Sequence, residues 1–230
     1  MTRVTPFEHD TDTVTDGPRH EHVVLLDDAH HIIGAAPKSA VHHRATPLHL
    51  GFSCHVLDAD GRTLISRRAS SKATWPGAWT NACCGHPAPG ETLRRAVDRR
   101  LGHELGVRSV RMSLALAHFV YRAAMPEGTV EHEVCPVVVA TIDGPPRPNP
   151  DEVADVTWLP WADVCRRASA APWTLTPWSV EQLSILGAGA PALLAAGGGE
   201  DRLLDRPPPF PAPAARKDGA VRRFAGPTAG

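Results

Sequence analysis

The chain has 230 residues, with 24 basic and 25 acidic side chains and a formal net charge of -1. This length suits one buried domain with extensions, and the balanced charge gives no support for a nucleic-acid partner. No apolar run reaches the roughly 18 residues that a membrane-spanning helix needs. The polar N-terminal stretch lacks the apolar core of a secretory signal, and the five cysteines have no paired spacing. We therefore expect a cytoplasmic protein with reduced thiols and no membrane association.

Sequence periodicity then predicts the elements in chain order. Residues 1–20 have few apolar side chains and no period, and they are expected to form a flexible arm. The ranges 23–33 and 48–68 each predict a β-hairpin, and the alternation in the second hairpin puts His49 on its more polar face. Residues 92–105 repeat apolar side chains with the period of a helix, which Gly106 is expected to terminate.

The second half of the chain predicts further strands followed by short helices. Strands are expected in VRMSLALAHFVYRA, in TVEHEVCPVVVATI with a break at Pro136, and in ADVTWLP. Helices are expected in ADVCRRASAAP and in WSVEQLSILGAG. This order predicts one domain in residues 21–187, with a mixed β-sheet covered by helices. Residues 188–230 are rich in Ala, Gly and Pro, and we expect a disordered C-terminal tail there.

A charged motif spans residues 85–107, GHPAPGETLRRAVDRRLGHELGV. It resembles the Nudix signature, in which a loop and a helix present carboxylates to a divalent metal at a diphosphate. Arg100 stands where that signature has a glutamate, and His103 where it has the first of two consecutive carboxylates. Because these acids normally gather Mg²⁺, their loss argues against hydrolysis. The alternative reading is a plain amphipathic helix with surface charges.

Further motifs extend this resemblance over about residues 20 to 180. They are EHVVLLDD, LHLGFSCHVLDADG, SRRASSKATWPGAWTNACCGHP, FVYRA, VEHEVCPV and APWTLTPW. Their order and spacing closely resemble the type 1 isopentenyl-diphosphate isomerase family. The resemblance implies an α/β (α+β) fold of the Nudix type, with a mixed β-sheet sandwiched between α-helices. It also implies an isomerase of isoprenoid precursor biosynthesis, which interconverts isopentenyl diphosphate and dimethylallyl diphosphate by protonation and deprotonation through a tertiary carbocation.

Moving a double bond in an unactivated alkene needs an acid and a base on opposite sides of the substrate. The resemblance places these roles on Cys84 and Glu133, without assigning the first proton to either, and gives Tyr121 a supporting role. A cysteine suits such chemistry because its ordinary pKa of about 8.5 lies near neutrality. We expect the phenol of Tyr121 to hydrogen-bond Glu133 or Cys84, and we interpret Cys83 as a small buried side chain.

The resemblance also implies an octahedral metal site of three imidazoles and two carboxylates: His42, His49, His86, Glu131 and Glu133. Residues 131 and 133 are two positions apart on a predicted strand, so their side chains project from the same face. His43 is a less favoured alternative to His42. This ligand set suits Mn, Zn or Fe better than Mg alone, and the sequence does not select among them. A second metal, Mg, is expected on Glu104 together with the substrate diphosphate.

Four basic side chains match the positions that bind the diphosphate in this family: Lys38, Arg68, Lys72 and Arg100. Trp178 matches an aromatic wall over the alkene, where a ring face attracts a cation. Two other functions stay open at this point. One is a Nudix hydrolase acting on a nucleoside diphosphate derivative, and the other is a non-catalytic metal-binding or partner-binding module that uses the proline-rich tail.

Overall fold

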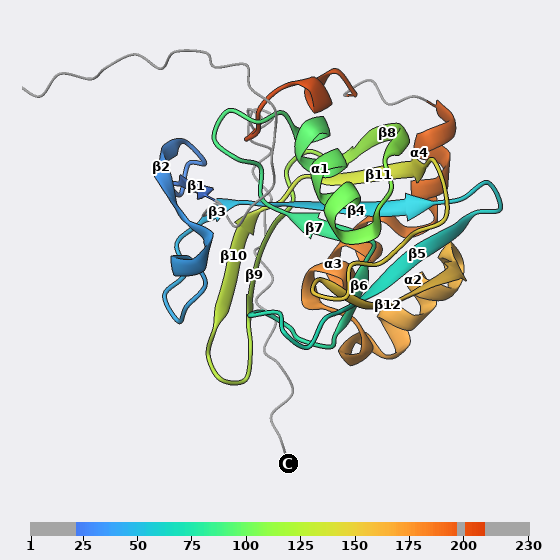
Figure 1. The fold of residues 1–230 in the computed structure, drawn as a ribbon, viewed down its shortest axis with the longest axis horizontal. Helices are drawn as coiled ribbons and strands as arrows, with labels where there is room; N and C mark the ends of the chain where they lie inside the picture. Colours follow the sequence, from blue (N-terminus) through green and yellow to red (C-terminus); the bar gives the residue numbers. More distant parts are fainter. Residues whose placement is uncertain (1–21, 197–200, 210–230) are drawn as a thin grey trace, which may run out of the picture.

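The computed structural model describes residues 22–196 and 201–209, which combine mixed β-sheets with helices (Figure 1). The strands are β1 (His22–Leu26), β2 (Ile32–Pro37), β3 (His49–Leu50), β4 (Phe52–Leu57), β5 (Arg62–Arg68), β6 (Trp79–Asn81), β7 (Cys83–Gly85), β8 (Ser109–Leu116), β9 (Val120–Ala124), β10 (Val130–Val134), β11 (Val137–Ile142) and β12 (Val153–Pro160). The helices are α1 (Leu93–Leu105), α2 (Trp161–Ala170), α3 (Pro177–Leu186) and α4 (Ala190–Ala196), with 3-10 turns η1 (Lys38–Ala40), η2 (Pro172–Thr174), η3 (Gly187–Gly189) and η4 (Asp201–Asp205).

The strands form two sheets, where the sequence predicts one. The first sheet has the order β2-β1-β3-β10-β9, and the second has the order β12-β5-β4-β11-β8, with β6 beside β5 and β7 beside β4. In each sheet the central pair is parallel, β3 with β10 and β4 with β11. These two pairs follow one another along the chain, and backbone bonds from Gly51 N to Val134 O and from Ser53 N to Pro136 O continue the pairing between the sheets. The two sheets are therefore joined through their centre, where Pro136 interrupts the second strand.

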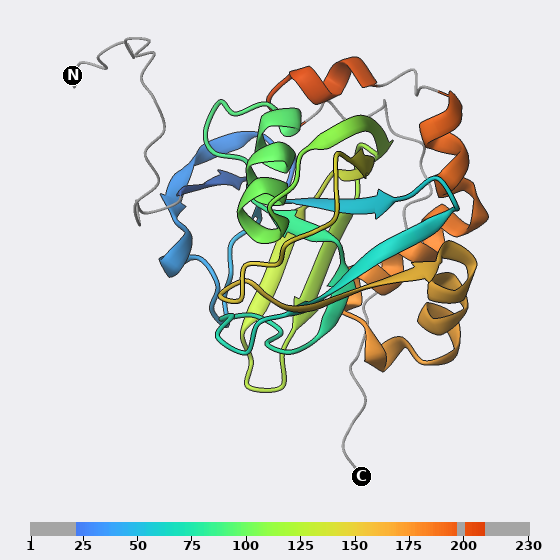
Figure 2. The same ribbon diagram turned by 45° about the vertical axis from the view of Figure 1, so that its right-hand side comes forward.

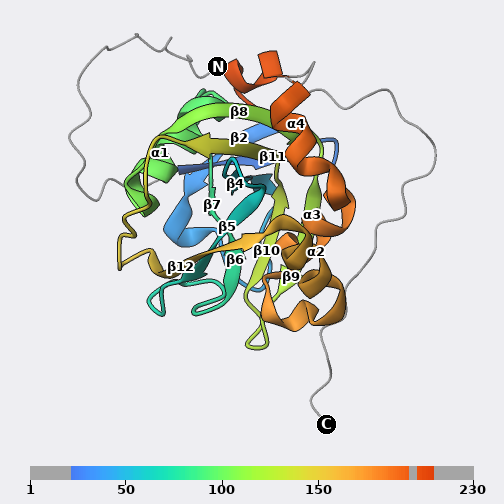
Figure 3. The same cartoon turned by 90° about the vertical axis from the view of Figure 1, so that its right-hand side faces the viewer.

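Helices cover both faces of the larger sheet, as expected for the Nudix-type layering. Figure 3 shows α1 on one side and α2, α3 and α4 on the other. Helix α1 begins at the N-cap Thr92, whose side chain accepts a hydrogen bond from Arg95 N, and ends at Gly106, which has the left-handed φ of 65°. Its apolar face, which includes Val97 and Leu101, packs on Phe52 of β4. None of the described helices is long and apolar enough to cross a membrane.

The predicted elements correspond to observed ones, but the face assigned to His49 is wrong. Both hairpins, the helix that ends before Gly106 and the strand break at Pro136 are present. His49 is expected on a polar face, yet its side chain is fully buried, and every residue of the following β4 is buried as well. Parallel central strands are covered on both faces. The alternation of polar and apolar residues therefore does not separate a buried face from an exposed one there.

The folded part of the chain continues past residue 187, where the sequence predicts the start of a disordered tail. Helix α4 packs on the core through Leu194, and η4 inserts Leu204, which is fully buried, beside α1 (Figure 2). Arg94 Nε donates to Asp205 Oδ1 at 2.7 Å, and Asp201 accepts from the Leu114 backbone amide at 3.1 Å. Helical elements therefore occur within the range in which the sequence predicts a tail. Residues 1–21, 197–200 and 210–230 lie outside the described part of the chain.

Candidate active site

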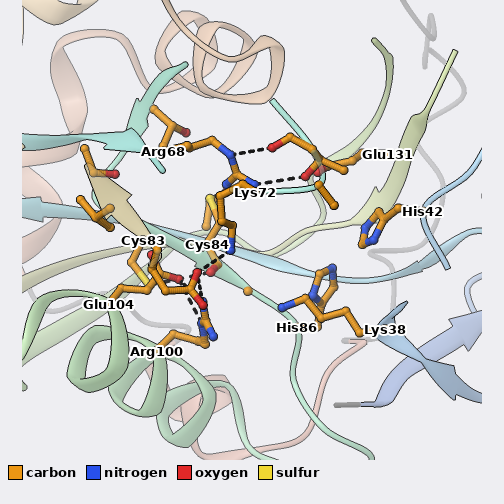
Figure 4. A pocket seen from close by; sticks show the side chains of 18 of the residues that line it. Lys38, His42, Arg68, Lys72, Cys83, Cys84, His86, Arg100, Glu104 and Glu131 are labelled. Atoms are coloured by element: carbon orange, nitrogen blue, oxygen red, sulfur yellow. Dashed lines mark hydrogen bonds and ion pairs between the residues drawn. The ribbon is translucent and has the colours of Figure 1, made fainter. Parts of the chain in front are cut away.

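A cavity of about 680 Å³ opens between the two sheets and brings the predicted site residues together (Figure 4). Every one of them except His49 lines this cavity: Lys38, His42, Arg68, Lys72, Cys84, His86, Arg100, Glu104, Tyr121, Glu131, Glu133 and Trp178. His49 lies behind the wall, 3.5 Å from Glu133 through its Nε2 atom. Residues that are up to 140 positions apart in the sequence thus share one concave site, which is the usual form of a small-molecule site.

Four of the five predicted metal ligands form a compact cluster. One donor atom from each of His42, His49, His86 and Glu133 lies within 4.8 Å of the other three. Strand pairing sets this up, because Glu133 of β10 lies directly opposite His49 of β3 in the parallel register. His42 follows η1 and His86 follows β7, so both approach the same strands from loops.

The polar atoms of this cluster fit a divalent metal. Nε2 of His42, Nε2 of His49 and Nδ1 of His86 are buried and make no hydrogen bond among the described residues. Burial, reinforced by the neighbouring imidazoles, lowers the pKa of His42 to about 3, and burial lowers that of His86 to about 4. Both rings are therefore neutral at pH 7, which is the form that binds metals. Three imidazoles with a carboxylate suit Mn, Fe or Zn.

Glu133 carries the charge of this cluster. Burial alone opposes ionisation, but the imidazoles of His49 and His86 next to the carboxylate lower its pKa below the ordinary range. Its Oε1 lies 3.2 Å from His86 Nε2. Burial opposes protonation of His49 too, yet the nearby carboxylate raises the pKa of that imidazole. The carboxylate and the imidazoles thus compensate one another inside the protein.

Glu131 lies apart from the four clustered residues, although the spacing on β10 puts it on the same face as Glu133. Its Oε2 accepts a hydrogen bond from Tyr121 Oη at 2.6 Å. Burial and the charge of Glu133 raise its pKa, while Arg68 and Thr74 counteract that rise. One expectation is corrected by this arrangement, because Tyr121 bonds Glu131 rather than Glu133 or Cys84. Glu131 is not among the four clustered residues, and its role as a metal ligand stays a prediction.

The two adjacent cysteines of β7 both border the cavity, but their side chains have different surroundings. The Cys83 side chain is buried in the apolar core among residues of α1 and β4. Cys84 is half-buried, and its Sγ lies 3.3 Å from Asn81 Oδ1 and 3.5 Å from Ser53 Oγ. Burial raises the pKa of the Cys84 thiol to about 11, against the influence of Ser53 and the charge of Arg68. Cys84 is therefore a thiol at neutral pH.

Trp178 contributes an aromatic ring to the wall of the cavity. It is almost fully buried at the start of α3, and its Nε1 donates to Asn81 Oδ1 at 3.1 Å. Its ring lies 5.7 Å from that of Tyr121 and 5.2 Å from that of Trp75, measured between centroids. The Arg68 guanidinium lies over the ring at 5.7 Å, which is the geometry of a cation–π contact.

Carboxylates hold the basic end of the cavity in place, and one of them is absent from the sequence-based set. Arg100 donates to Glu104 Oε1 at 2.6 Å and to Glu152 Oε2 at 3.1 Å, and Lys72 also donates to Glu152. Charge from Arg100 and Lys72 lowers the pKa of Glu152 to about 2, although burial opposes this shift. Glu152 stands just before β12 in an acidic loop. No periodic pattern or motif in the surrounding sequence indicates that this residue belongs to the site. Asn81 lies within the quoted TNACCGHP motif but is not in the sequence-based set either.

Comparisons with known proteins agree with this geometry. A family model of the NUDIX domain matches residues 47–179. An isopentenyl-diphosphate Delta-isomerase from Frankia alni is 50% identical over 176 residues, covering 76% of this chain and 91% of the relative. One from Mycolicibacterium vanbaalenii is 52% identical over 168 residues, covering 73% and 92%. The crystal structure of DR0079 from Deinococcus radiodurans shares the fold, with a TM-score of 0.55 and 20% identity over 72% of this chain and 98% of that one. The chain therefore belongs to the isopentenyl-diphosphate Delta-isomerase family, built on a NUDIX domain.

Proposed function

We propose that this chain interconverts isopentenyl diphosphate and dimethylallyl diphosphate. The observation that carries this proposal is the placement of a thiol and a carboxylate in one cavity that also has a cationic end. Cys84 and Glu133 line that cavity together with Lys72 and Arg100. The relatives named above support the same activity.

The protonation states of the two side chains suit an exchange of protons with the substrate. Cys84 holds a proton, and Glu133 is a carboxylate. In the forward direction the Cys84 S–H bond breaks, and the proton adds to the terminal alkene carbon to leave a tertiary cation. Glu133 then removes a proton from the carbon on the other side of the cation, and the new double bond forms there. The reverse direction exchanges these roles, as microscopic reversibility requires.

Other side chains orient the substrate and protect the cation. Lys38, Arg68, Lys72 and Arg100 bind the diphosphate oxygens in this proposal, with charge-assisted hydrogen bonds. Trp178 presents its ring to the cation and, with Tyr121, walls off water that would trap it. Tyr121 keeps its proton, because burial and the charge of Glu131 raise its pKa well above the ordinary value. Its phenol therefore holds Glu131 rather than acting as a base.

The proposed metals belong to the two ends of the cavity. His42, His49, His86 and Glu133 would hold one divalent ion, Mn, Zn, Fe or Mg, with Glu131 close by to complete the set. Such an ion supplies positive charge next to the Glu133 carboxylate and so changes its proton affinity. Glu104 would hold a Mg ion that arrives with the substrate diphosphate. These side chains fit the ions by donor type and burial.

A proton-exchange assay tests the proposal directly. The purified chain, supplied with Mn²⁺ and Mg²⁺, is incubated with isopentenyl diphosphate in deuterated water and followed by NMR. We expect the dimethylallyl isomer to form and deuterium to enter the allylic positions of substrate and product. The metal content of the same sample is measured, since a folded, metal-loaded sample that gives neither isomer nor exchange would refute the proposal. Phosphate release is monitored in parallel, because it would indicate hydrolysis instead.

A further inference from the structure

Residues of helix α3 form hydrogen bonds with Asn81 and Ser53, two side chains that lie against the Cys84 sulfur. The first is Asn81, whose Nδ2 donates to two backbone carbonyl groups of β4 and β7 at 3.1 and 2.8 Å. This fixes its Oδ1 as the atom that faces Cys84, and Trp178 Nε1 and Ser179 Oγ of α3 both donate to the same oxygen. An amide oxygen only accepts hydrogen bonds, so the Cys84 S–H group is the donor at 3.3 Å. Asn81 therefore favours the protonated sulfur.

The second contact is Ser53, and its hydroxyl is oriented by a buried chain of polar groups. His55 Nε2 lies 3.1 Å from Gln182 Oε1, and Gln182 Nε2 donates to Ser53 Oγ at 2.9 Å. Because the Ser53 oxygen already accepts from Gln182, its own proton is left to donate. The acceptors within reach are the sulfurs of Cys84 and Cys135, each 3.5 Å away.

Burying this series of hydrogen-bonded side chains costs free energy, and the series ends at a side chain that lines the cavity. Ser53, His55 and Gln182 are each at most 2% exposed. Burying polar groups costs free energy that a packed apolar core would avoid, and hydrogen bonds only offset it. Burial also lowers the pKa of His55 to about 4, so the ring stays neutral and takes no part in charge transfer. The direction of the donors, from His55 toward Cys84, is the feature that a purely structural network does not need.

We propose that Ser53 is a positioning residue that stabilises the Cys84 sulfur when it becomes negatively charged, and that Gln182 turns the Ser53 hydroxyl toward it. The inference rests on the proposed function of Cys84. When Cys84 gives its proton to the alkene carbon, the electron pair of the S–H bond stays on sulfur, and the Ser53 O–H donates to the resulting thiolate. Asn81 stabilises the thiol and Ser53 the thiolate, so α3 supports both states of one catalytic cycle.

Three substitutions separate this role from simple packing. Ser53→Ala removes the donor, and Ser53→Thr keeps a hydroxyl in the same place. Gln182→Glu keeps the size of the side chain but replaces the donor by a carboxylate, which accepts from Ser53 and turns its proton away from Cys84. Thr63→Val is the matched control, because the Thr63 hydroxyl is equally buried yet makes no hydrogen bond among the described residues.

Steady-state kinetics of the metal-loaded isomerase test this proposal. For Ser53→Ala and Gln182→Glu we expect kcat to fall by about 10- to 100-fold, the loss typical of one hydrogen bond to a charged group. KM should stay within about twofold, because the diphosphate contacts are untouched. The solvent deuterium isotope effect on kcat should rise as proton transfer becomes slower. Ser53→Thr should recover most of the rate, and Thr63→Val should behave like the unmodified chain.

Other results would overturn the inference. Unchanged kcat in folded Ser53→Ala and Gln182→Glu would remove the role of the hydroxyl. Loss of rate together with a lower melting temperature and an unchanged isotope effect would make the network structural. If Gln182→Glu fails to fold, the Ser53→Ala and Ser53→Thr pair decides the question alone. Absence of turnover in the unmodified chain would refute the proposed function itself, which keeps the two failures distinct.

Discussion

The doublet Cys83-Cys84 allows the proposed acid–base role to be tested with two nearly identical substitutions. Cys84→Ala removes a sulfur that lines the cavity, 3.3 Å from Asn81 Oδ1. Cys83→Ala removes the neighbouring sulfur, whose side chain is 1% exposed and faces the apolar core under α1. Each variant loses one sulfur atom from adjacent positions of β7, so any difference between them reports the direction in which the side chain points.

The structure sets different magnitudes for the two losses. A positioned proton donor contributes about 10² to 10⁴ in rate, so Cys84→Ala should lower kcat by that factor. KM should change little, because in the proposed function the diphosphate is bound by other side chains, among them Lys72 and Arg100. Cys83→Ala leaves a small void in the core. Its cost is about 1 kcal/mol, which corresponds to a melting temperature lower by about 2 to 4 °C for a domain of this size, with turnover largely kept.

The assay measures kcat, KM and the melting temperature of both variants in the same metal-loaded buffer. Circular dichroism confirms that each variant is folded before its rate is interpreted. Equal losses of kcat at the two positions would contradict the assigned directions of the side chains. Turnover by Cys84→Ala within a factor of about three of the unmodified chain would refute the reasoning that Cys84 exchanges a proton with the substrate.

Three further outcomes follow from the site and the C-terminal segment. Glu133→Gln removes the carboxylate of the four-residue cluster. The affinity of this variant for Mn²⁺, measured by calorimetry, should fall by at least the 10- to 100-fold that is typical of losing an outer-shell partner. The Glu152 pKa is lowered from 4.5 to about 2, so its stabilising effect is present above pH 4.5 and is lost as the pH falls toward 2. Glu152→Gln should therefore be less stable than the unmodified chain to urea at pH 7, by a smaller margin at pH 3, and nearly equal to it only at or below pH 2; a constant difference would contradict this. Leu204→Ala empties a fully buried position, and a cost of about 2 to 5 kcal/mol should lower the melting temperature by several degrees.

Local patterns predict much of the fold because local physics controls it. The helix from Leu93 to Leu105 follows from its apolar stripe, its N-cap Thr92 and Gly106 in a left-handed conformation. The break at Pro136 follows from a missing backbone donor. The burial of His49 does not follow, because the sequence does not say that both faces of its strand are covered.

The parts of the site that the sequence analysis misses depend on tertiary contacts. Glu152 acquires its role only when the loop before β12 meets Lys72 and Arg100. Gln182 lies on a predicted helix, yet its importance depends on the approach of that helix to Ser53. The C-terminal segment is missed for another reason. Its composition is dominated by Ala, Gly and Pro, and two short leucine pairs, at 193–194 and 203–204, are too weak a signal to outweigh that average.

The exchange of one carboxylate for Arg100 explains how this scaffold serves a different reaction. In the Nudix signature the helix gathers metals at a diphosphate with several acids, and these charges need cations to balance them. Here Arg100 supplies that cation from the protein itself, and Glu104 and Glu152 hold it at the end of the cavity. Burial opposes the charge of Arg100, but the charges of Glu104 and Glu152 outweigh it and raise the pKa of the guanidinium above its ordinary value. In the proposed function this pairing positions Arg100 to anchor the diphosphate, while the double bond moves between Cys84 and Glu133, which line the same cavity.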